Sequence, residues 1–303
     1  MAIQVTILGS GAALPTSSRN PSGQYVNCND RHILIDCGEG TQNQLRKYGI
    51  KLQKITHILI SHLHGDHFFG LVGLLSTMHL LGRDSGIVIY GPPELEQIIR
   101  MQLEIGGARI DFPLTFVPIS GNDTKLLFED RLLEIHTFPL RHRIPANGFL
   151  LKEKLKDRPL NGEKFKEDGL SLTLIPKLKA GLDVELEDGT MIYADDYTFA
   201  QLPVRSYAYC SDTVYLPEIA EKIKGVSCLY HEATFLENMR DRAKFTLHST
   251  AGDAAKIALA ANAGRLLLGH LSARYTEAQG HLDEASPIFP NVTVVEDGDV
   301  FTI

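Results

Sequence analysis

The sequence is poor in cysteine, has no long apolar run and carries no excess of positive charge. Its four cysteines among 303 residues include no Cys-x-x-Cys pair, so we expect reduced thiols and not a disulfide framework. No apolar run reaches the roughly 18 residues of a membrane span, and the N-terminus lacks the basic start of a signal peptide. These absences predict a cytoplasmic protein without a membrane partner. The net charge of −7 argues mildly against a surface coated for nucleic acid.

Apolar residues make up 44% of the chain, enough for a substantial core, and they fall into short runs between glycine-rich turns. The predicted strands are Gln4–Leu8, His32–Asp36, His57–Ser61, Ile87–Tyr90, Leu114–Ile119, Leu132–Phe138, Ser206–Ser211, Ser227–Tyr230, Arg265–Leu268 and Val292–Glu296. The predicted helices are Thr41–Tyr48, Leu71–Leu81, Pro93–Ile105 and Ala251–Asn262. Runs of strands with helices to cover them predict an α/β fold in which two sheets pack together between helices.

Residues 62 to 67 read His-Leu-His-Gly-Asp-His, directly after a predicted buried strand. Four strong metal ligands within six residues are hard to explain by packing, although a solvated histidine-rich loop is the alternative. We expect Gly65 to let the chain turn, so that His62 and His64 face one ion while Asp66 and His67 face another. The motif therefore predicts a two-metal site.

Three further candidate ligands follow predicted strands: His142, Asp212 and His270. Taken singly, each could be a surface or capping residue. Ends of neighbouring strands are held in rigid register, however, so side chains there can converge on one point. We therefore expect His62, His64 and His142 to hold one ion and Asp66, His67 and His270 the other, with Asp212 bridging the two.

Imidazole and carboxylate ligands favour two Zn²⁺ ions per chain, although Fe²⁺ or Mn²⁺ would fit the same donors. Two metal ions about 3.5–4 Å apart stabilise both the nucleophile and the phosphoryl oxygens of an in-line displacement. Zinc also lowers the pKa of bound water to about 7, so hydroxide is available to attack a phosphodiester. Asp66 is our candidate to orient that hydroxide or act as its base. The same charges would serve many hydrolases, so they do not define the substrate.

The ligand pattern resembles that of the metallo-β-lactamase superfamily, and nearly the whole chain resembles its ribonuclease Z branch. The motifs that carry the closer resemblance are Asp36-Cys37-Gly38-Glu39-Gly40-Thr41-Gln42, His231-Glu232-Ala233-Thr234, His248-Ser249-Thr250 and His270-Leu271-Ser272-Ala273-Arg274-Tyr275. The resemblance implies a zinc-dependent endoribonuclease that removes the 3′ trailer from precursor tRNA. It also implies a four-layer αββα sandwich formed by residues 1–303 as a single domain, and a homodimer.

Two further catalytic residues are expected beside the metal ligands. His248 is the candidate donor of a proton to the leaving ribose oxygen, and Glu232 would accept its other N–H and fix its tautomer. The alternative for His248 is a helix-cap residue beside Ser249, which we expect to be the N-cap of the following helix. Asp36 is expected to orient a metal-binding histidine.

The segment 152–179 interrupts the pattern of strands and helices. It carries eight basic and five acidic side chains, a net +3 in a chain of net −7. It occupies the position of the family's flexible tRNA-binding arm, which we place at about residues 151–190, although the family's Pro-Pro-Gly-Pro run is absent. A solvated linker without a partner is the alternative. The loop Ser10–Asn20 resembles a second RNA-contacting loop, in which Arg19 would touch the RNA backbone.

Two other functions remain open at the level of the sequence. A small-molecule or cyclic-nucleotide phosphodiesterase of the same superfamily could use the same metal ions without an arm. A catalytically silent RNA-binding scaffold is the alternative that is not an enzyme. Such a protein would lose metal ligands, whereas this chain keeps all seven.

Overall fold

The computed structural model describes residues 3–122 and 124–303, which fold into two compact units. The large unit contains the described residues up to Lys152 and those from Arg205 to Ile303. The small unit contains Glu153–Val204, inserted between two strands of the large unit. Among the described residues, every helix is too short or too polar to cross a membrane.

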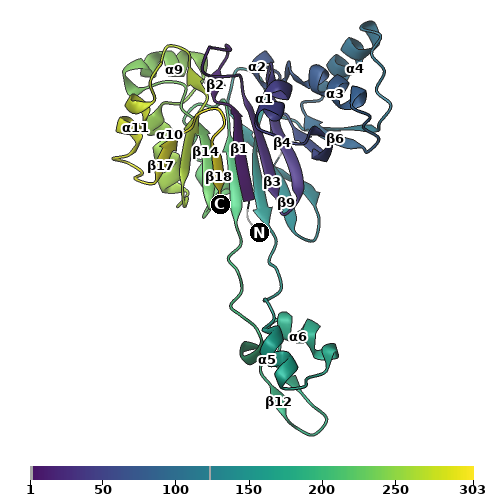
Figure 1. The fold of residues 1–303 in the computed structure, drawn as a ribbon. Helices are drawn as coiled ribbons and strands as arrows, with labels where there is room; N and C mark the ends of the chain where they lie inside the picture. Colours follow the sequence, from purple (N-terminus) through teal and green to yellow (C-terminus); the bar gives the residue numbers. More distant parts are fainter. Residues whose placement is uncertain (1–2, 123) are drawn as a thin grey trace. The chain divides into compact units, whose positions relative to one another are not determined.

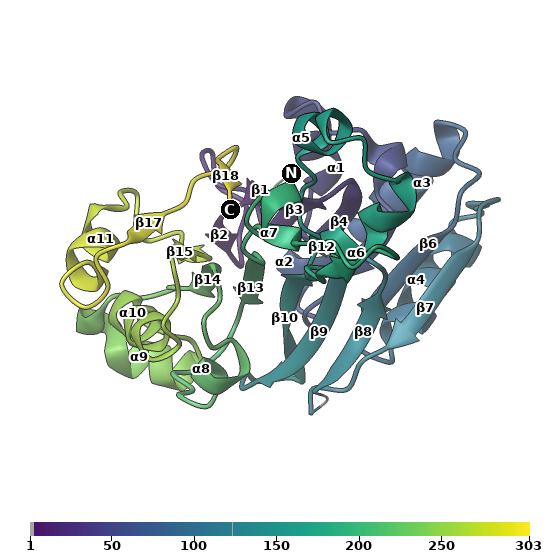
Figure 2. The same cartoon turned by 90° about the horizontal axis from the view of Figure 1, so that it is seen from below.

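The large unit is built on two sheets, each of seven strands within the described part of the chain. The first sheet consists, in spatial order, of β18 (Val300–Thr302), β1 (Ile3–Gly9), β3 (Gly23–Cys28), β4 (Arg31–Cys37), β5 (His57–Leu59), β6 (Ile87–Gly91) and β7 (Leu114–Pro118). The second consists of β17 (Val292–Val294), β15 (Leu266–Gly269), β14 (Cys228–Glu232), β13 (Ser206–Cys210), β10 (Ala146–Glu153), β9 (Leu133–Leu140) and β8 (Lys125–Glu129). Figure 2 shows β8, β9 and β10 side by side at one end of that sheet.

The two sheets pack face to face through a core that draws apolar side chains from both. Ile7 and Ile35 of the first sheet share this cluster with Phe149, Tyr209 and Leu267 of the second. Strands with both faces covered bury nearly every residue, and β15 is an example of such a run. The two packed sheets therefore form the two central layers of the large unit.

Helices cover the outer face of each sheet (Figure 1). On the first sheet these are α1 (Thr41–Lys47), α3 (Leu71–Leu80) and α4 (Leu95–Ile105). On the second they are α8 (Ile219–Lys222), α10 (Ala251–Ala260) and α11 (Gln279–Ala285). The predicted four-layer αββα arrangement is confirmed.

The ends of the parallel strands determine where functional side chains gather. In the first sheet β4, β5, β6 and β7 run parallel, and in the second β13, β14, β15 and β17 do so. Parallel strands bring their carboxyl ends to the same edge of a sheet. A minor pairing of β2 (Gly11–Ala12) with β16 (Leu271–Ser272) then joins a loop of the N-terminal half to the segment after β15.

Every predicted strand and helix overlaps one in the structure, but several elements were missed. The missed strands of the two large sheets are β3, β8, β10 and β18. β8 is an edge strand with a largely exposed pattern, and β10 begins Ala-Asn-Gly and ends in the lysine-rich segment. Neither offers the apolar run or the strict alternation that predicts a strand.

The small unit has a hydrophobic core of its own. Its described elements are α5 (Gly162–Glu167), α6 (Ile175–Lys179), β11 (Val184–Glu185), β12 (Met191–Ile192) and α7 (Ala194–Tyr197), with a short 3₁₀ turn (Leu172–Leu174). Phe165, Leu178 and Ile192 are buried together, and the Phe165 ring meets that of Tyr197 edge to face. The sequence did not predict this core, because its apolar residues are spaced without a helical or strand period.

Truncating the centre of this core tests whether the small unit folds as a separate body. Phe165→Ala should lower the free energy of unfolding of the small unit by about 3–5 kcal/mol, more than so small a core can lose and stay folded. Hydrogen exchange followed by mass spectrometry should then show lost protection within residues 153–204 and unchanged protection in the large unit. Leu172→Ala, at a side chain 75% exposed, is the matched control and should change little. Uniform loss of protection across both units would contradict this division.

Candidate metal centre

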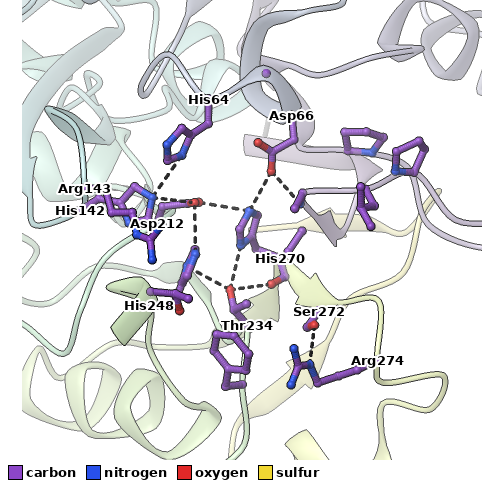
Figure 3. Close-up of a pocket in the computed structure, with 18 of the residues that line it drawn as sticks. His64, Asp66, His142, Arg143, Asp212, Thr234, His248, His270, Ser272 and Arg274 are labelled. Atoms are coloured by element: carbon purple, nitrogen blue, oxygen red, sulfur yellow. Dashed lines mark hydrogen bonds and ion pairs between the residues drawn. The ribbon is translucent and has the colours of Figure 1, made fainter. Parts of the chain in front are cut away.

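Six polar side chains stand at or just beyond the carboxyl ends of strands in the large unit. Asp36 belongs to the end of β4, His62 follows β5 and His142 follows β9. On the second sheet Asp212 follows β13, Glu232 ends β14 and His270 follows β15. His64, Asp66 and His67 come from the loop after β5 and from α2 (Gly65–Phe68). The structure brings all seven predicted ligands into one centre. Figure 3 shows His64, Asp66, His142, Asp212 and His270 of this set.

One group of donors consists of three imidazoles and one carboxylate oxygen. The Nδ1 atom of His64 lies 3.1 Å from Nε2 of His62 and 3.2 Å from Nε2 of His142. The Oδ2 atom of Asp212 lies 3.6 Å from the same nitrogen of His62 and 3.5 Å from that of His142. These four side chains form one possible metal site.

A second group of donors shares the same aspartate. The Oδ2 atom of Asp66 lies 3.5 Å from Nε2 of both His67 and His270. The other oxygen of Asp212, Oδ1, lies 3.3 Å from Nε2 of His67 and 3.2 Å from Nε2 of His270. Asp212 thus offers one oxygen to each group, which is the arrangement that a bridging carboxylate needs.

The spacing of these atoms fits a metal ion. Ligand atoms about 2.0–2.2 Å from a tetrahedral zinc ion lie about 3.4 Å from one another, close to the distances found in both groups. The Nε2 atoms of His67 and His270 are buried without a hydrogen-bond partner among the described residues. A buried nitrogen without a partner is costly unless another group satisfies it. The donor set therefore fits one divalent cation in each group.

The second ring nitrogen of each buried histidine is held so that Nε2 faces the centre. The Nδ1 atom of His67 is 2.8 Å from Oδ2 of Asp36, and that of His142 is 2.9 Å from the backbone oxygen of Leu247. Nδ1 of His62 lies 3.0 Å from the hydroxyl of Ser61, which itself donates to Asp36. Such partners fix the tautomer of a metal-binding histidine. The expected role of Asp36 agrees with this geometry.

Asp36 also connects the two sheets beneath the centre. Its carboxylate accepts hydrogen bonds from the backbone N–H of Ser61 and, at 2.7 Å, from the hydroxyl of Tyr209 on β13. Its φ of 55° lies in the left-handed region, which costs energy for a residue with a side chain. The backbone of β4 is therefore held in a strained conformation where it aims this carboxylate at His67.

Glu232 connects the proposed proton donor His248 with the predicted metal ligand His270. Its Oε1 atom accepts a hydrogen bond from Nδ1 of His248 at 2.8 Å, as predicted. Its Oε2 atom accepts from the hydroxyl of Thr234 at 2.6 Å, and that hydroxyl lies 2.9 Å from Nδ1 of His270. One buried carboxylate thus orients both His248 and His270. The Nε2 atom of His248 is left facing the cleft, 3.9 Å from Oδ2 of Asp212.

Ser249 does not cap the helix that follows His248. The N-cap of α10 is Thr250, whose side chain accepts from the backbone N–H of Asp253 in a capping box. The hydroxyl of Ser249 instead donates to the backbone oxygen of Thr213 at 2.7 Å. The predicted cap is therefore displaced by one residue, and Ser249 fastens the loop of His248 to the loop of Asp212.

The electrostatics of the centre favour a positive charge. Burial lowers the pKa of His67, yet Asp66, Asp212 and Asp36 outweigh it and hold that pKa well above its ordinary value. Burial likewise lowers the pKa of His248, but Glu232 and the aspartates raise it to about 9. Burial would raise the pKa of Asp212, and the surrounding histidines hold it well below its usual range. Three carboxylates around one spot attract a cation.

Asp66 is oriented by the loop between β2 and β3. The backbone N–H of Ala13, a residue at φ 60°, donates to Oδ2 of Asp66 at 2.8 Å.

Arg19 was expected to touch RNA, but it is buried and its guanidinium donates to the backbone oxygen of Tyr275 at 2.6 Å. That expectation is wrong, because Arg19 holds this loop against the segment after β16.

Gly65 serves a different purpose from the one predicted. It is the first residue of α2, and its φ lies outside the left-handed region. A Cβ atom there would lie 2.2 Å from a ring carbon of Phe69. The loop needs glycine for space beneath this ring, and the turn between His64 and Asp66 comes from the start of the helix.

Three arginines that the sequence reasoning missed line the cleft above the centre. Arg143, Arg242 and Arg274 border a cavity of about 600 Å³ together with His64, Asp66, His142, Asp212, His248 and His270. In Figure 3 Arg143 and Arg274 lie on opposite sides of the histidines. Arg143 directly follows the predicted ligand His142, and Arg274 lies four residues after His270. Their nearness to predicted ligands in the sequence is what could have identified them.

Comparisons with known proteins agree with this geometry. A family model described as Anti-Pycsar protein Apyc1 matches residues 3–112, less than half of the chain. The chain is 45% identical over 304 residues to ribonuclease Z of Cytophaga hutchinsonii, covering 100% of this chain and 97% of that protein. The crystal structure of human tRNase Z, short form, is 31% identical with a TM-score of 0.71, and the match covers 99% of each chain.

A further solved structure shares the fold at lower identity. The metallo-β-lactamase fold protein YhfI from Bacillus subtilis has a TM-score of 0.71 and 18% identity over 100% of both chains. At this identity its likeness concerns the fold alone, whereas the 45% identity to ribonuclease Z is spread over a match that covers the whole chain. The chain therefore belongs to the ribonuclease Z family of hydrolases with the metallo-β-lactamase fold.

Proposed function

We propose that this protein is a zinc-dependent endoribonuclease that removes the 3′ trailer from precursor tRNA. The observation that carries the proposal is the pair of donor groups sharing Asp212, at the base of a cleft bordered by three arginines. Two cations there suit a phosphodiester anion, and the arginines add positive charge where the flanking phosphates of RNA would lie. The names of the ribonuclease Z and tRNase Z relatives support tRNA as the substrate.

The proposed metal ligands are the seven residues expected from the sequence. His62, His64 and His142 would hold one ion and Asp66, His67 and His270 the other, with Asp212 contributing one oxygen to each. Zinc suits these donors best, and Mn²⁺ or Fe²⁺ are possible substitutes. When bound, two such ions supply charge stabilisation at the phosphate and lower the pKa of water. The side chain of Asp66, held by the N–H of Ala13, is placed to orient that water.

His248 is the proposed proton donor to the leaving 3′ oxygen of the ribose. Its Nδ1 proton is held by Glu232, so Nε2 is the atom that faces the cleft. The buried carboxylate stabilises the imidazolium, and the raised pKa keeps a proton on the ring at neutral pH. His248 can therefore deliver the proton that an alkoxide leaving group requires.

The small unit is the proposed flexible arm that binds the tRNA body. It holds seven basic and eleven acidic side chains, so its net charge is −4. All seven basic groups fall within residues 153–180, whereas six of the acidic ones fall within residues 183–196. The first half of the unit therefore offers the cationic surface for RNA. The proposal includes the homodimer that the family resemblance implies and the cytoplasmic location expected from the sequence.

The metal assignment predicts two ions in each active chain. Elemental analysis of the active protein should find two transition-metal ions, and chelation should abolish cleavage until zinc or manganese is restored. Asp212→Ala should lose both the metal and the activity, because its two oxygens face both donor groups. Asp84→Ala, at an exposed carboxylate, is the control and should retain both. Full activity with one ion or none would rule out this assignment.

The proposed proton donor should matter most when the leaving group is poor. His248→Ala should slow cleavage of precursor tRNA by about 10²–10⁴-fold, the usual contribution of general acid catalysis. Hydrolysis of bis(p-nitrophenyl) phosphate should fall much less, because p-nitrophenolate leaves without a proton. The metal content should stay the same, and His136→Ala on β9 should behave like the wild type. Equal losses on both substrates would assign His248 a structural role.

The arm predicts a specific dependence of RNA binding on salt. Lys166, Lys177 and Lys179 are exposed or half-exposed, and replacing all three by Gln should leave the small unit folded. Each lost phosphate contact should reduce the slope of log affinity against log salt by about 0.7–0.9. Hydrolysis of bis(p-nitrophenyl) phosphate should stay within a few-fold.

The matched control for this variant removes the same charge from the large unit. Lys51, Lys222 and Lys224 are exposed and lie outside the residues that border the cleft, so replacing them by Gln should leave the slope unchanged. If the two triple variants bind precursor tRNA with the same affinity and the same salt dependence, the small unit is not the arm that binds the tRNA. The small-molecule phosphodiesterase would then become the favoured function.

A further inference from the structure

The three arginines that border the cleft each lie next to a phenylalanine ring. The guanidinium carbons of Arg143 and Arg242 lie 5.5 and 5.7 Å from the ring centre of Phe245. That of Arg274 lies 5.1 Å from the ring centre of Phe235. Guanidinium groups next to aromatic rings are the combination with which proteins hold single-stranded nucleic acid, by stacking on bases and neutralising phosphates.

The two phenylalanines differ in what they can contact. Phe235 is 4% exposed and packs against Arg274, so almost none of its ring surface is open to a nucleobase. Phe245, on α9 (Arg240–Thr246), is 71% exposed, so most of its ring surface is open to solvent. Its backbone oxygen accepts a hydrogen bond from Arg143 at 3.2 Å, which fastens this end of the helix to the residue next to His142. Phe245 thus presents an exposed ring on a backbone that Arg143 holds in place.

The position of Phe245 relates it to the leaving group. Leu247, two residues later, accepts the hydrogen bond from Nδ1 of His142, and His248 follows directly. The rings of His142 and His248 are centred 4.9 Å apart. One short segment therefore carries both the ring of Phe245 and the proposed proton donor.

We propose that Phe245 is a stacking platform for the nucleobase on the 5′ side of the cleaved bond, the nucleotide whose 3′ oxygen leaves. Arg143 and Arg242 neutralise the phosphates beside that base. The inference rests on the proposed function and adds a direction for the RNA strand. Arg274 lies across the histidines from Arg143 in Figure 3, so the first trailer nucleotide occupies that side.

The test removes the base and the ring separately. Two precursor tRNAs are compared with the intact one, with an abasic nucleotide either just 5′ or just 3′ of the cleaved bond. For the wild type, the 5′ abasic substrate should lose about 5- to 100-fold in kcat/KM, the range of one base stacked on an aromatic ring. Phe245→Leu should lose a similar factor on the intact substrate. It should then show little further loss on the 5′ abasic substrate, because the stack is already gone.

The matched variants separate stacking from a general effect of substitution. Phe245→Tyr keeps the ring and should preserve the sensitivity to the 5′ base. Tyr215→Leu removes another exposed aromatic side chain, which lies beside the cation of Lys256. Lys256 does not border the cleft, whereas Arg143 and Arg242 beside Phe245 do, so this variant should also preserve that sensitivity. 2-Aminopurine at the 5′ position should be quenched on binding to the wild type and less so on binding to Phe245→Leu.

The inference and the proposed function fail in different ways. Wild-type protein that cleaves precursor tRNA but ignores the 5′ base would overturn the stacking platform and leave the proposed function standing. Equal abasic penalties in the wild type and Phe245→Leu would do the same. A dependence on the 3′ base in place of the 5′ base would reverse the direction of the strand and overturn the inference. Wild-type protein that does not cleave precursor tRNA would overturn both.

Discussion

The centre depends on the carboxylate of Asp212, whose two oxygens face different pairs of histidines. Oδ2 of Asp212 faces His62 and His142, and Oδ1 faces His67 and His270, all at 3.2–3.6 Å. A buried carboxylate surrounded by imidazoles is stable only if positive charge compensates it. Partners at Nδ1 of His62, His67, His142 and His270 leave Nε2 of each ring facing Asp212, where it can take a proton or a cation.

The two-sheet architecture allows such a centre to form. Ligands from the first sheet lie between residues 62 and 67, and those from the second follow β9, β13 and β15. Neither sheet alone supplies a complete donor group, since Asp212 completes the first group and His270 the second. The packing of the sheets, with Tyr209 donating to Asp36 between them, therefore sets the distance between the two halves of the centre. Close-packed cores resist small displacements, which keeps that distance constant.

The sequence predicted which side chains would gather at the centre, because they are clustered in the chain or stand at strand ends. His62 to His67 form a rare pattern, and the apolar runs before Asp212 and His270 identify where strands end. Contacts between distant side chains were not predictable in this way. Arg19 was predicted to contact RNA but is buried against Tyr275. The exposed ring of Phe245 becomes a candidate contact only through Arg143 and Arg242, which lie 102 and three residues away in the chain. The core of the small unit was missed because its apolar residues follow neither helical nor strand spacing.

The order of the ligands along the chain has a consequence for assembly during synthesis. The ribosome releases His62 to His67 first, then His142, and only after the whole small unit does it release Asp212 and His270. A nascent chain that ends before Asp212 holds donors from both groups but lacks the carboxylate that the two groups share. Domains generally fold from the N-terminus as they emerge, at about 5–20 residues per second. The paired centre is therefore among the last features of the molecule to form, and newly made protein stays inactive until its C-terminal third has folded.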